Sequence, residues 1–283
     1  MLDKIIKLGI SKREIEELLK VSNDIERDYK KLLLNYPIQY LIGYVNFYGN
    51  KINVNENVLI PRYETEFLVE KTIKYCKELF NKKIKILDLC TGNIPIPLIL
   101  SCKTDAIIYG VEIQKEIFSL ANKTLKINHL ENQILLLNKD AKMLIKDFET
   151  DTFDLITCNP PYFKNTNESI KNNNDIKSIA RHEILITLED IVNISKKLLK
   201  NNGSLCLIHR TDRLIDIIVL MRKNNIEPKR IRFIYPKEGK ESNLVLIDGK
   251  KNGKPGLKIL NPLIVHNKDG KYTEEVLKMF GSE

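Results

Sequence analysis

The most distinctive residues of the chain are Asn159, Pro160, Pro161 and Tyr162, which directly follow the apolar, strand-like run 153–158. An amide or an aromatic amine is a poor nucleophile, because its nitrogen lone pair is delocalised into the neighbouring π-system. The Asn159 side-chain oxygen and the Pro160 carbonyl can both accept hydrogen bonds from such an NH2 group, and Tyr162 can stack on the planar group. The prolines stiffen the turn and hold both acceptors in place. The pattern therefore predicts a catalytic turn that presents a planar nitrogen; a proline-rich turn with an Asn cap is the alternative.

Polar residues at the ends of successive strand-like runs predict a nucleoside-binding site. The candidate ligands of the cofactor are Asp88, Thr91, Gly92, Asn93, Glu112, Ile113, Asp140, Ala141 and Asn159. Open parallel sheets bind ligands outside the carboxyl ends of their strands, where the strand order reverses. The glycine turn lets backbone N–H groups approach a ligand, Glu112 can accept both ribose hydroxyls, and Asp140 can accept an adenine amino group. Singly, each acid has a structural alternative: a strand-end cap for Asp88, a surface charge for Glu112 and a helix N-cap for Asp140.

The glycine turn also distinguishes between nucleoside ligands. A second glycine usually follows soon after the first, but residues 94–97 read Ile-Pro-Ile-Pro after Gly92. A dinucleotide site needs close backbone approach to a pyrophosphate, whereas S-adenosyl-L-methionine has none. Its sulfonium would supply a methyl group, and the product nitrogen can lose its proton without a dedicated strong base. We therefore predict an S-adenosylmethionine-dependent N-methyltransferase, with no metal.

Alternating strand-like and helix-like segments from residue 83 onward predict the elements that position these residues. Such alternation is typical of a mostly parallel sheet with helices on both faces. We expect strands at 84–89, 106–112, 133–137, 153–158 and 204–209, helices at 93–102, 114–128, 140–147 and 187–200, and an antiparallel hairpin over 230–235 and 242–248. The predicted fold is α/β: a Rossmann-like, class I methyltransferase with a seven-stranded sheet and a small helical N-terminal region.

The chain divides into four predicted parts. Residues 1–45 read as helices, with Ser11 as an N-cap followed by Glu14. The part 46–83 reads as a β-hairpin over 47–54 and 57–60, followed by a helix over 65–80. The methyltransferase domain spans 84–250, including an Asn- and Lys-rich loop at 164–176, and 251–283 is a tail packed on or extending it.

Composition sets limits on location and partners. Of 283 residues 43% are hydrophobic, and the apolar runs fall short of the roughly 20 residues that a membrane span needs. The N-terminus lacks the apolar core of a secretory signal, so we expect a soluble, cytoplasmic protein. The cysteines (Cys76, Cys90, Cys102, Cys158, Cys206) show no metal-binding spacing, and we interpret them as reduced core residues. The net charge of +9 is spread along the chain, which fits a polyanionic partner or a biased composition equally well.

From about residue 88 to 280 the chain resembles the bacterial tRNA(Val) adenine-N6-methyltransferases. The resembling segments are Asp88–Asn93, Gly110–Gln114, Ala180–Glu183, His209–Arg210, Pro228–Lys237 and Lys254–Lys258. The resemblance implies tRNA as the partner and a flipped adenine whose N6 amine lies between Asn159 and Pro160. It also implies that Arg181, His182, His209 and Arg210 contact phosphate or base. Alternatively, Arg181 pairs with Glu183 and His209 caps its strand.

Before that part, the chain resembles the HemK/PrmC family, which methylates a release-factor glutamine at N5. The resembling segments are Pro37–Gly43, Phe47–Gly49 and Val58–Glu66. The chain thus looks like a mosaic of two related families joined near residue 85. Our main hypothesis is tRNA adenine-N6 methylation, the alternative is N5-glutamine methylation of release factors, and a non-catalytic cofactor- or RNA-binding module is the third.

Overall fold

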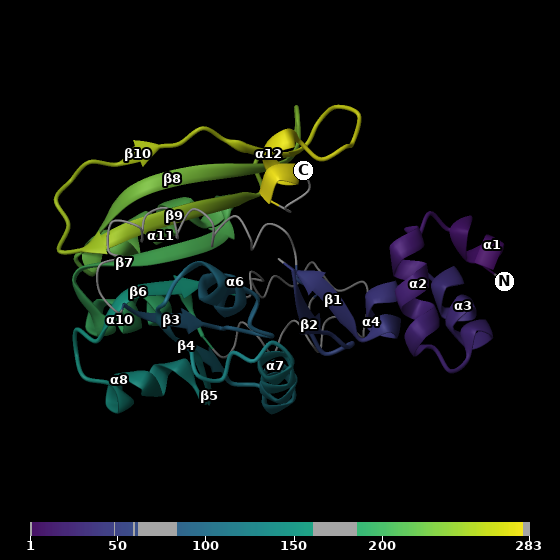
Figure 1. Cartoon of the computed structure of the whole chain (residues 1–283). Helices are drawn as coiled ribbons and strands as arrows, with labels where there is room; N and C mark the ends of the chain where they lie inside the picture. The colour runs from purple at the N-terminus through teal and green to yellow at the C-terminus, as the bar shows by residue number, and fades with distance from the viewer. Residues whose placement is uncertain (1, 48, 59, 62–83, 161–185, 280–283) are drawn as a thin grey trace, which may run out of the picture.

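The computed structural model describes residues 2–47, 49–58, 60–61, 84–160 and 186–279. A helical N-terminal region lies to one side of a large α/β body, and a small hairpin lies between the two (Figure 1). The expected helix over 65–80 and the loop over 164–176 fall outside the described residues. Among the described helices, none is long and apolar enough to cross a bilayer.

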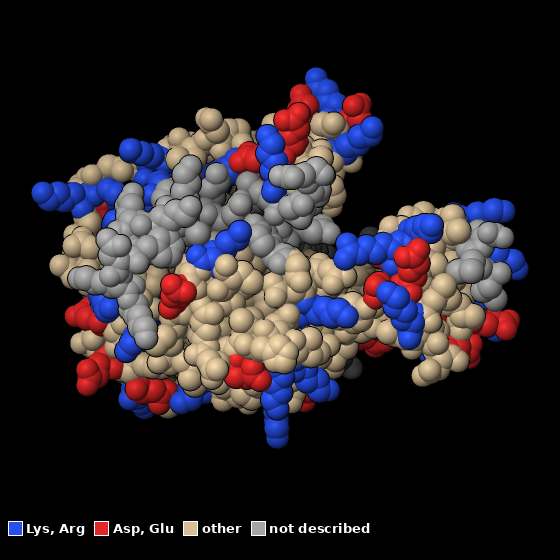
Figure 2. All heavy atoms as spheres, viewed as in Figure 1, with Lys and Arg blue, Asp and Glu red and all other residues tan. Residues whose placement is uncertain are grey.

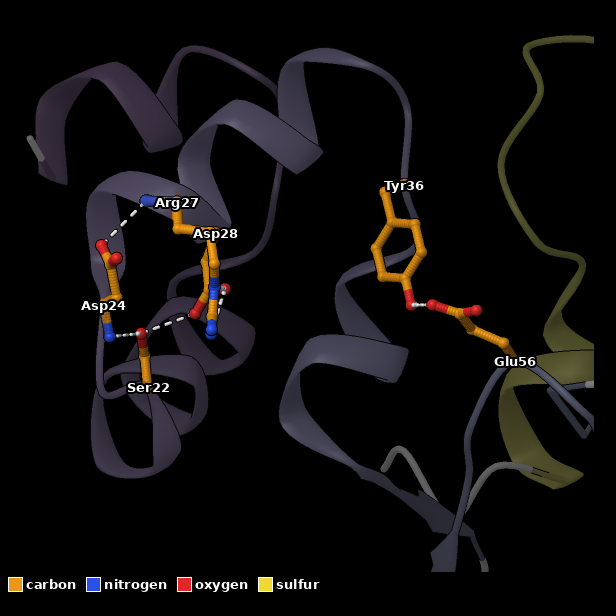
Figure 3. A network of polar contacts seen from close by, with 6 residues as sticks. All are labelled: Ser22, Asp24, Arg27, Asp28, Tyr36 and Glu56. Atoms are coloured by element: carbon orange, nitrogen blue, oxygen red, sulfur yellow. Dashed lines mark hydrogen bonds and ion pairs between the residues drawn. The ribbon is translucent and has the colours of Figure 1, made fainter.

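The N-terminal region contains four short helices with an apolar cluster of their own. They are α1 (Leu2–Ile6), α2 (Lys12–Val21), α3 (Ile25–Leu33) and α4 (Ile38–Ile42). The predicted cap of α2 is confirmed, because Ser11 and Glu14 form a reciprocal capping box. Asp24 caps α3 by accepting a 2.9 Å hydrogen bond from the Arg27 backbone N–H (Figure 3). The caps satisfy N–H groups at the starts of helices that are too short to be stable alone.

The predicted β-hairpin is present, but its predicted position is wrong. Strands β1 (Tyr44–Phe47) and β2 (Asn50–Asn53) pair antiparallel, and the turn falls inside the expected first strand. Gly49 has a φ of +77°, a conformation that glycine adopts without strain, and it therefore places the turn there. The expected second strand at 57–60 is not a strand at its described positions.

The predicted α/β class is confirmed by a twisted, mostly parallel sheet. Its strands are β3 (Lys85–Leu89), β4 (Ile107–Glu112), β5 (Ile134–Asn138), β6 (Phe153–Cys158), β7 (Leu199–Arg210), β8 (Ile226–Lys237), β9 (Leu244–Lys251), β10 (Lys258–Ile259) and β11 (Leu263–His266). The order is β10-β8-β9-β7-β6-β3-β4-β5, and β11 also pairs with β8. The expected antiparallel hairpin is β8–β9. The sheet has nine strands rather than seven, because β10 and β11 of the C-terminal tail extend its edge in parallel with β8.

The strand order reverses between β3 and β6, which creates the position where ligands bind in such sheets. The chain runs outward from β3 to β4 and β5 on one side and from β6 to β7 on the other. Strands β3 and β6 are buried over nearly their whole length, as expected of central parallel strands. The carboxyl ends of β3 and β6 therefore lie side by side, with Leu89 paired to Cys158.

Helices and the hairpin cover the two faces of the sheet. They are α6 (Pro95–Lys103), α7 (Lys115–Ile127), α8 (Leu144–Asp147), α10 (Leu188–Leu198), α11 (Leu214–Lys223) and α12 (Glu274–Met279), with 3-10 turns at Ala141–Met143 and Thr211–Arg213. Apolar residues of α6, α7, α12 and the hairpin form the core on one face. Those of α8, α10 and α11 form the core on the other face. Helix α11 was not expected from the sequence.

The cysteines differ in burial. Cys158 and Cys206 are buried, Cys90 is half-buried, and Cys102 is exposed. The interpretation as core residues is therefore wrong for Cys102, which lies in the last turn of α6, is exposed, and accepts a 3.2 Å hydrogen bond from the Asn50 side chain. Cys76 lies outside the described residues.

Candidate active site

Asp88 lies in β3 and is completely buried beneath the carboxyl edge of the sheet. Its two carboxylate oxygens accept hydrogen bonds of 2.6 Å from the hydroxyls of Thr91 and Thr157. Burial raises the pKa of Asp88 to about 7, and the bonds from Thr157 and Thr91 oppose that rise. Asp88 therefore ties the loop after β3 to β6, two residues before Asn159. Thr157 was not among the predicted site residues, although a polar residue within an apolar strand is a usable signal.

The loop after β3 has an unusual backbone. Cys90, Gly92 and Ile94 all have φ between 55° and 58°, so two non-glycine residues adopt the left-handed conformation. This conformation is strained for a β-branched residue such as Ile94, and such strain is often found at functional sites. A Cβ built on Gly92 meets nothing within 4 Å, so the space beside this glycine is open.

Glu112 ends β4 and is buried next to the glycine loop. One carboxylate oxygen accepts a 3.1 Å hydrogen bond from the Gly92 N–H, and the other accepts a 2.8 Å bond from the Gln114 N–H. These bonds fix the carboxylate beside the loop, and each oxygen retains acceptor capacity for a ligand hydroxyl. A carboxylate fixed in this way supplies hydrogen-bond acceptors, and these are what the hydroxyls of a ribose diol require.

The end of β5 forms the next side of the site. Asp140 accepts a 2.9 Å bond from the Lys142 N–H at the start of a 3-10 turn, so the N-cap alternative describes its contacts here. Ala141 is buried, and Ile113 is exposed at the end of β4. Asn138 donates to the carbonyls of Glu112 and Ile113, at 2.8 and 3.2 Å, and thereby holds the ends of β4 and β5 together. An exposed apolar side chain beside a polar strand end suits an adenine ring.

Asn93 follows Gly92, but its side chain turns away from the open face of the loop. The amide nitrogen donates to the backbone carbonyl of Asn53 in β2, and the amide oxygen accepts a 3.1 Å bond from Thr124 in α7. Asn93 is buried. Its contacts therefore connect the cofactor loop to the hairpin.

The expected catalytic turn starts directly after β6. Asn159 is half-buried and Pro160 is buried, next to the loop that follows β3. Pro161 and Tyr162 lie outside the described residues, as do Arg181 and His182. The structure thus brings Asn159 and Pro160 to the same edge of the sheet as Gly92 and Glu112.

His209 and Arg210 end β7, on the other side of β6. His209 is buried, and its Nδ1 accepts a 2.8 Å bond from the Arg210 N–H. Burial, and secondarily the charge of Arg213, lowers the pKa of His209 to about 4, so its ring is neutral near pH 7. The exposed Arg210 pairs with Asp212 at 2.8 Å. The geometry thus gives His209 a hydrogen-bonding role rather than an ionic one.

The residues at this edge fit S-adenosyl-L-methionine. The loop at Gly92 is open, Glu112 can hold the ribose, and Ile113 can contact the adenine. The carboxyl ends of β3, β4, β5 and β6 meet at the reversal of the strand order, as such a ligand requires.

Comparison with known proteins identifies the class. A family model described as RNA methyltransferase matches residues 44–206, which is more than half of the chain. Among solved structures, a predicted O-methyltransferase from Agrobacterium tumefaciens has a TM-score of 0.57 at 18% identity, covering 71% of this chain and 90% of that one. The hMettl16 catalytic domain in complex with the MAT2A 3'UTR hairpin 1 has a TM-score of 0.52 at 16% identity, covering 76% and 78%. These similarities show the fold of the S-adenosylmethionine-dependent methyltransferases.

Curated relatives specify the class further. A release factor glutamine methyltransferase of Thermodesulfovibrio yellowstonii is 35% identical over 66% of this chain, and the match spans 64% of that relative's length. One of Streptococcus pneumoniae is 31% identical over 80% of both chains. The chain therefore belongs to the S-adenosylmethionine-dependent methyltransferase family that includes the release factor glutamine methyltransferases, and S-adenosyl-L-methionine is its cofactor.

Proposed function

We propose that the protein transfers a methyl group from S-adenosyl-L-methionine to N5 of a glutamine in a peptide chain release factor, in the cytoplasm. The observation that carries this proposal is the similarity to the Streptococcus pneumoniae relative. A match over 80% of 283 residues cannot lie wholly on one side of residue 85. One family of relatives therefore matches both parts of the apparent mosaic, which favours glutamine over adenine.

In this proposal, the described residues bind the cofactor and orient the acceptor. Glu112, held by the backbone N–H groups of Gly92 and Gln114, is positioned to accept the ribose hydroxyls. The bound cofactor supplies an electrophilic methyl group on its sulfonium. The Asn159 amide oxygen and the Pro160 carbonyl accept the two hydrogens of the acceptor NH2, which fixes the rotation of this group and directs its lone pair.

A transfer assay tests this proposal. The protein is incubated with methyl-labelled S-adenosylmethionine and a purified, unmethylated release factor that carries a Gly-Gly-Gln loop. We expect label on the glutamine of that loop, and none when Asn159→Ala replaces the wild type. A catalytically active preparation that labels no release factor would contradict the proposal.

Adenine N6 in tRNA is the second candidate acceptor. The family model that matches residues 44–206 is described as RNA methyltransferase, and the net charge is +9. A parallel reaction with bulk unmodified tRNA tests it by nucleoside analysis for N6-methyladenine. Label in tRNA with none in the release factor would make adenine the acceptor.

A further inference from the structure

A buried hydrogen-bond network joins the cofactor loop to the N-terminal part of the chain. Asn93 of the loop donates to the Asn53 carbonyl and accepts from the Thr124 hydroxyl, whose oxygen in turn accepts a 3.0 Å bond from the Asn53 N–H. Thr124 is completely buried and Asn93 nearly so. Water therefore does not compete for these bonds, and losing one leaves a buried group unpaired.

The loop end of this network is part of the cofactor site. Asn93 directly follows Gly92, whose N–H holds the Glu112 carboxylate. Thr124 lies in α7, the helix that begins shortly after Glu112. Any movement of the loop on ligand binding at Glu112 would therefore act on Asn93 and, through it, on Asn53.

The hairpin, which is the other end of the network, is linked to the N-terminal helices by hydrogen bonds. The Val54 N–H donates to the Gly43 carbonyl at 2.9 Å, and the Tyr44 hydroxyl donates to Glu17 of α2. The Tyr36 hydroxyl donates to Glu56 at 2.5 Å, as Figure 3 shows. Several polar contacts thus join the hairpin and the segment directly after it to the N-terminal helices.

The N-terminal helices stand beside a hollow in the molecular surface. Figure 2 shows this hollow between the N-terminal helices and the C-terminal end of the described chain, with Lys and Arg side chains on the N-terminal side. The N-terminal helices form one side of this hollow, so their orientation bears on the space open to a large acceptor there.

We propose that Asn93 and Thr124 are positioning residues that couple the cofactor loop to the hairpin, so that cofactor binding orders the N-terminal region. Asn93 thus acts through Asn53 rather than by contacting the cofactor with its side chain. The coupling requires only cofactor binding, and it does not rest on which acceptor is methylated.

The experiment is amide hydrogen exchange of residues 44–54, measured with and without S-adenosylhomocysteine. In the wild type, we expect the ligand to slow exchange in this segment by about tenfold, the factor that corresponds to one hydrogen bond. Asn93→Ala removes both routes from the loop to Asn53, so the ligand should no longer protect the hairpin. Thr124→Val keeps the shape but removes the hydroxyl, so it should reduce the protection while the direct bond from Asn93 to the Asn53 carbonyl remains. Thr124→Ser retains the hydroxyl and should restore the protection.

Asn128→Ala is the matched control, because Asn128 ties the same hairpin to the same helix without touching the loop. Its amide donates to the Lys51 carbonyl at 2.8 Å and accepts from the Lys51 N–H at 3.2 Å. We expect faster exchange of the hairpin in this variant, with the effect of the ligand unchanged. We also expect KM for S-adenosylmethionine to rise about tenfold in Thr124→Val, with kcat nearly constant, and to stay constant in Asn128→Ala.

Two results would overturn the proposal: no protection of 44–54 in the wild type, or protection equal to the wild type in Asn93→Ala. If Asn93→Ala does not fold, Thr124→Val tests the branch through the hydroxyl, and protection equal to the wild type in that variant overturns the proposal. Failure of the release-factor assay leaves these measurements unaffected, since they need no acceptor.

Discussion

Two buried groups at the carboxyl edge of the sheet are expected to make stability depend on pH with opposite signs. The pKa of Asp88 rises from 3.8 to about 7, so between these values the folded protein holds a proton that the unfolded chain has lost. Its contribution to stability is complete below pH 3.8 and is lost as the pH rises through 7. The pKa of His209 falls from 6.5 to about 4, so its contribution is complete above pH 6.5 and is lost as the pH falls through 4.

The two effects overlap and should largely cancel. Each site changes the free energy of unfolding by about 1.4 kcal/mol per pH unit within its window. Between about pH 4.5 and 6.5 the slopes oppose each other, so these two groups leave the wild type nearly flat. Asp88→Asn removes the group whose contribution to stability falls with rising pH. The free energy of unfolding of this variant, relative to that of the wild type, should therefore increase by on the order of 4 kcal/mol from pH 4 to pH 8. His209→Gln should show the reverse trend, by about 3 kcal/mol.

Urea denaturation at several pH values between 4 and 8 measures these slopes. The chain has no tryptophan, so unfolding is followed by far-ultraviolet circular dichroism. The double variant is the control, because removing both groups should restore the flat profile. If Asp88→Asn keeps the wild-type pH dependence, the buried carboxyl does not retain its proton and the reasoning is refuted.

Three further substitutions test the cofactor site and the catalytic turn. Gly110→Ala should weaken S-adenosylhomocysteine binding several-fold in calorimetry, because its Cβ would lie 2.9 Å from Leu136 and 3.1 Å from the Thr91 hydroxyl; unchanged affinity would mean that the loop tolerates the shift. Glu112→Gln places an NH2 group opposite a backbone N–H donor, so affinity for the same ligand should fall at least about tenfold, and an unaltered value would exclude the ribose role. Asn159→Ala should reduce kcat by about a hundredfold or more while the cofactor Kd stays constant, which separates acceptor orientation from cofactor binding.

The central strands could be predicted because a strand that is buried on both faces appears in the sequence as a mostly apolar run. The runs at β3 and β6 are mostly apolar, and a polar residue near or directly after the end of each, Asp88 and Asn159, marks the site edge. Helix α11 was missed because its sequence, Leu-Ile-Asp-Ile-Ile-Val-Leu, is rich in β-branched residues that favour strands. The tail over 251–283 was predicted to pack on the domain or extend it, but its strands were not predicted. Strands β10 and β11 form by pairing with β8, a contact that local sequence does not encode.

The finer features of the site depend on contacts between distant segments. The sequence indicated that the loop after β3 lacks a second glycine, but not that Ile94 would adopt the same backbone conformation. Nor did it indicate that Asn93 would bond to Asn53, forty residues earlier in the chain. Residue type alone gave no reason to expect the contact with Asn53, because a polar residue after a glycine turn fits a cofactor contact equally well.

Acceptor choice cannot come from the catalytic turn alone. The carboxamide of glutamine and the amino group of adenine both offer a planar NH2, and Asn159 with Pro160 can accept hydrogen bonds from either. Discrimination must therefore come from other surfaces, and we expect the N-terminal helices to be one of them. The hydrogen bonds of Asn93 connect the cofactor loop to the hairpin that follows the N-terminal helices. A difference in acceptor between related enzymes can thus arise in the N-terminal region while the cofactor site and the turn after β6 stay the same.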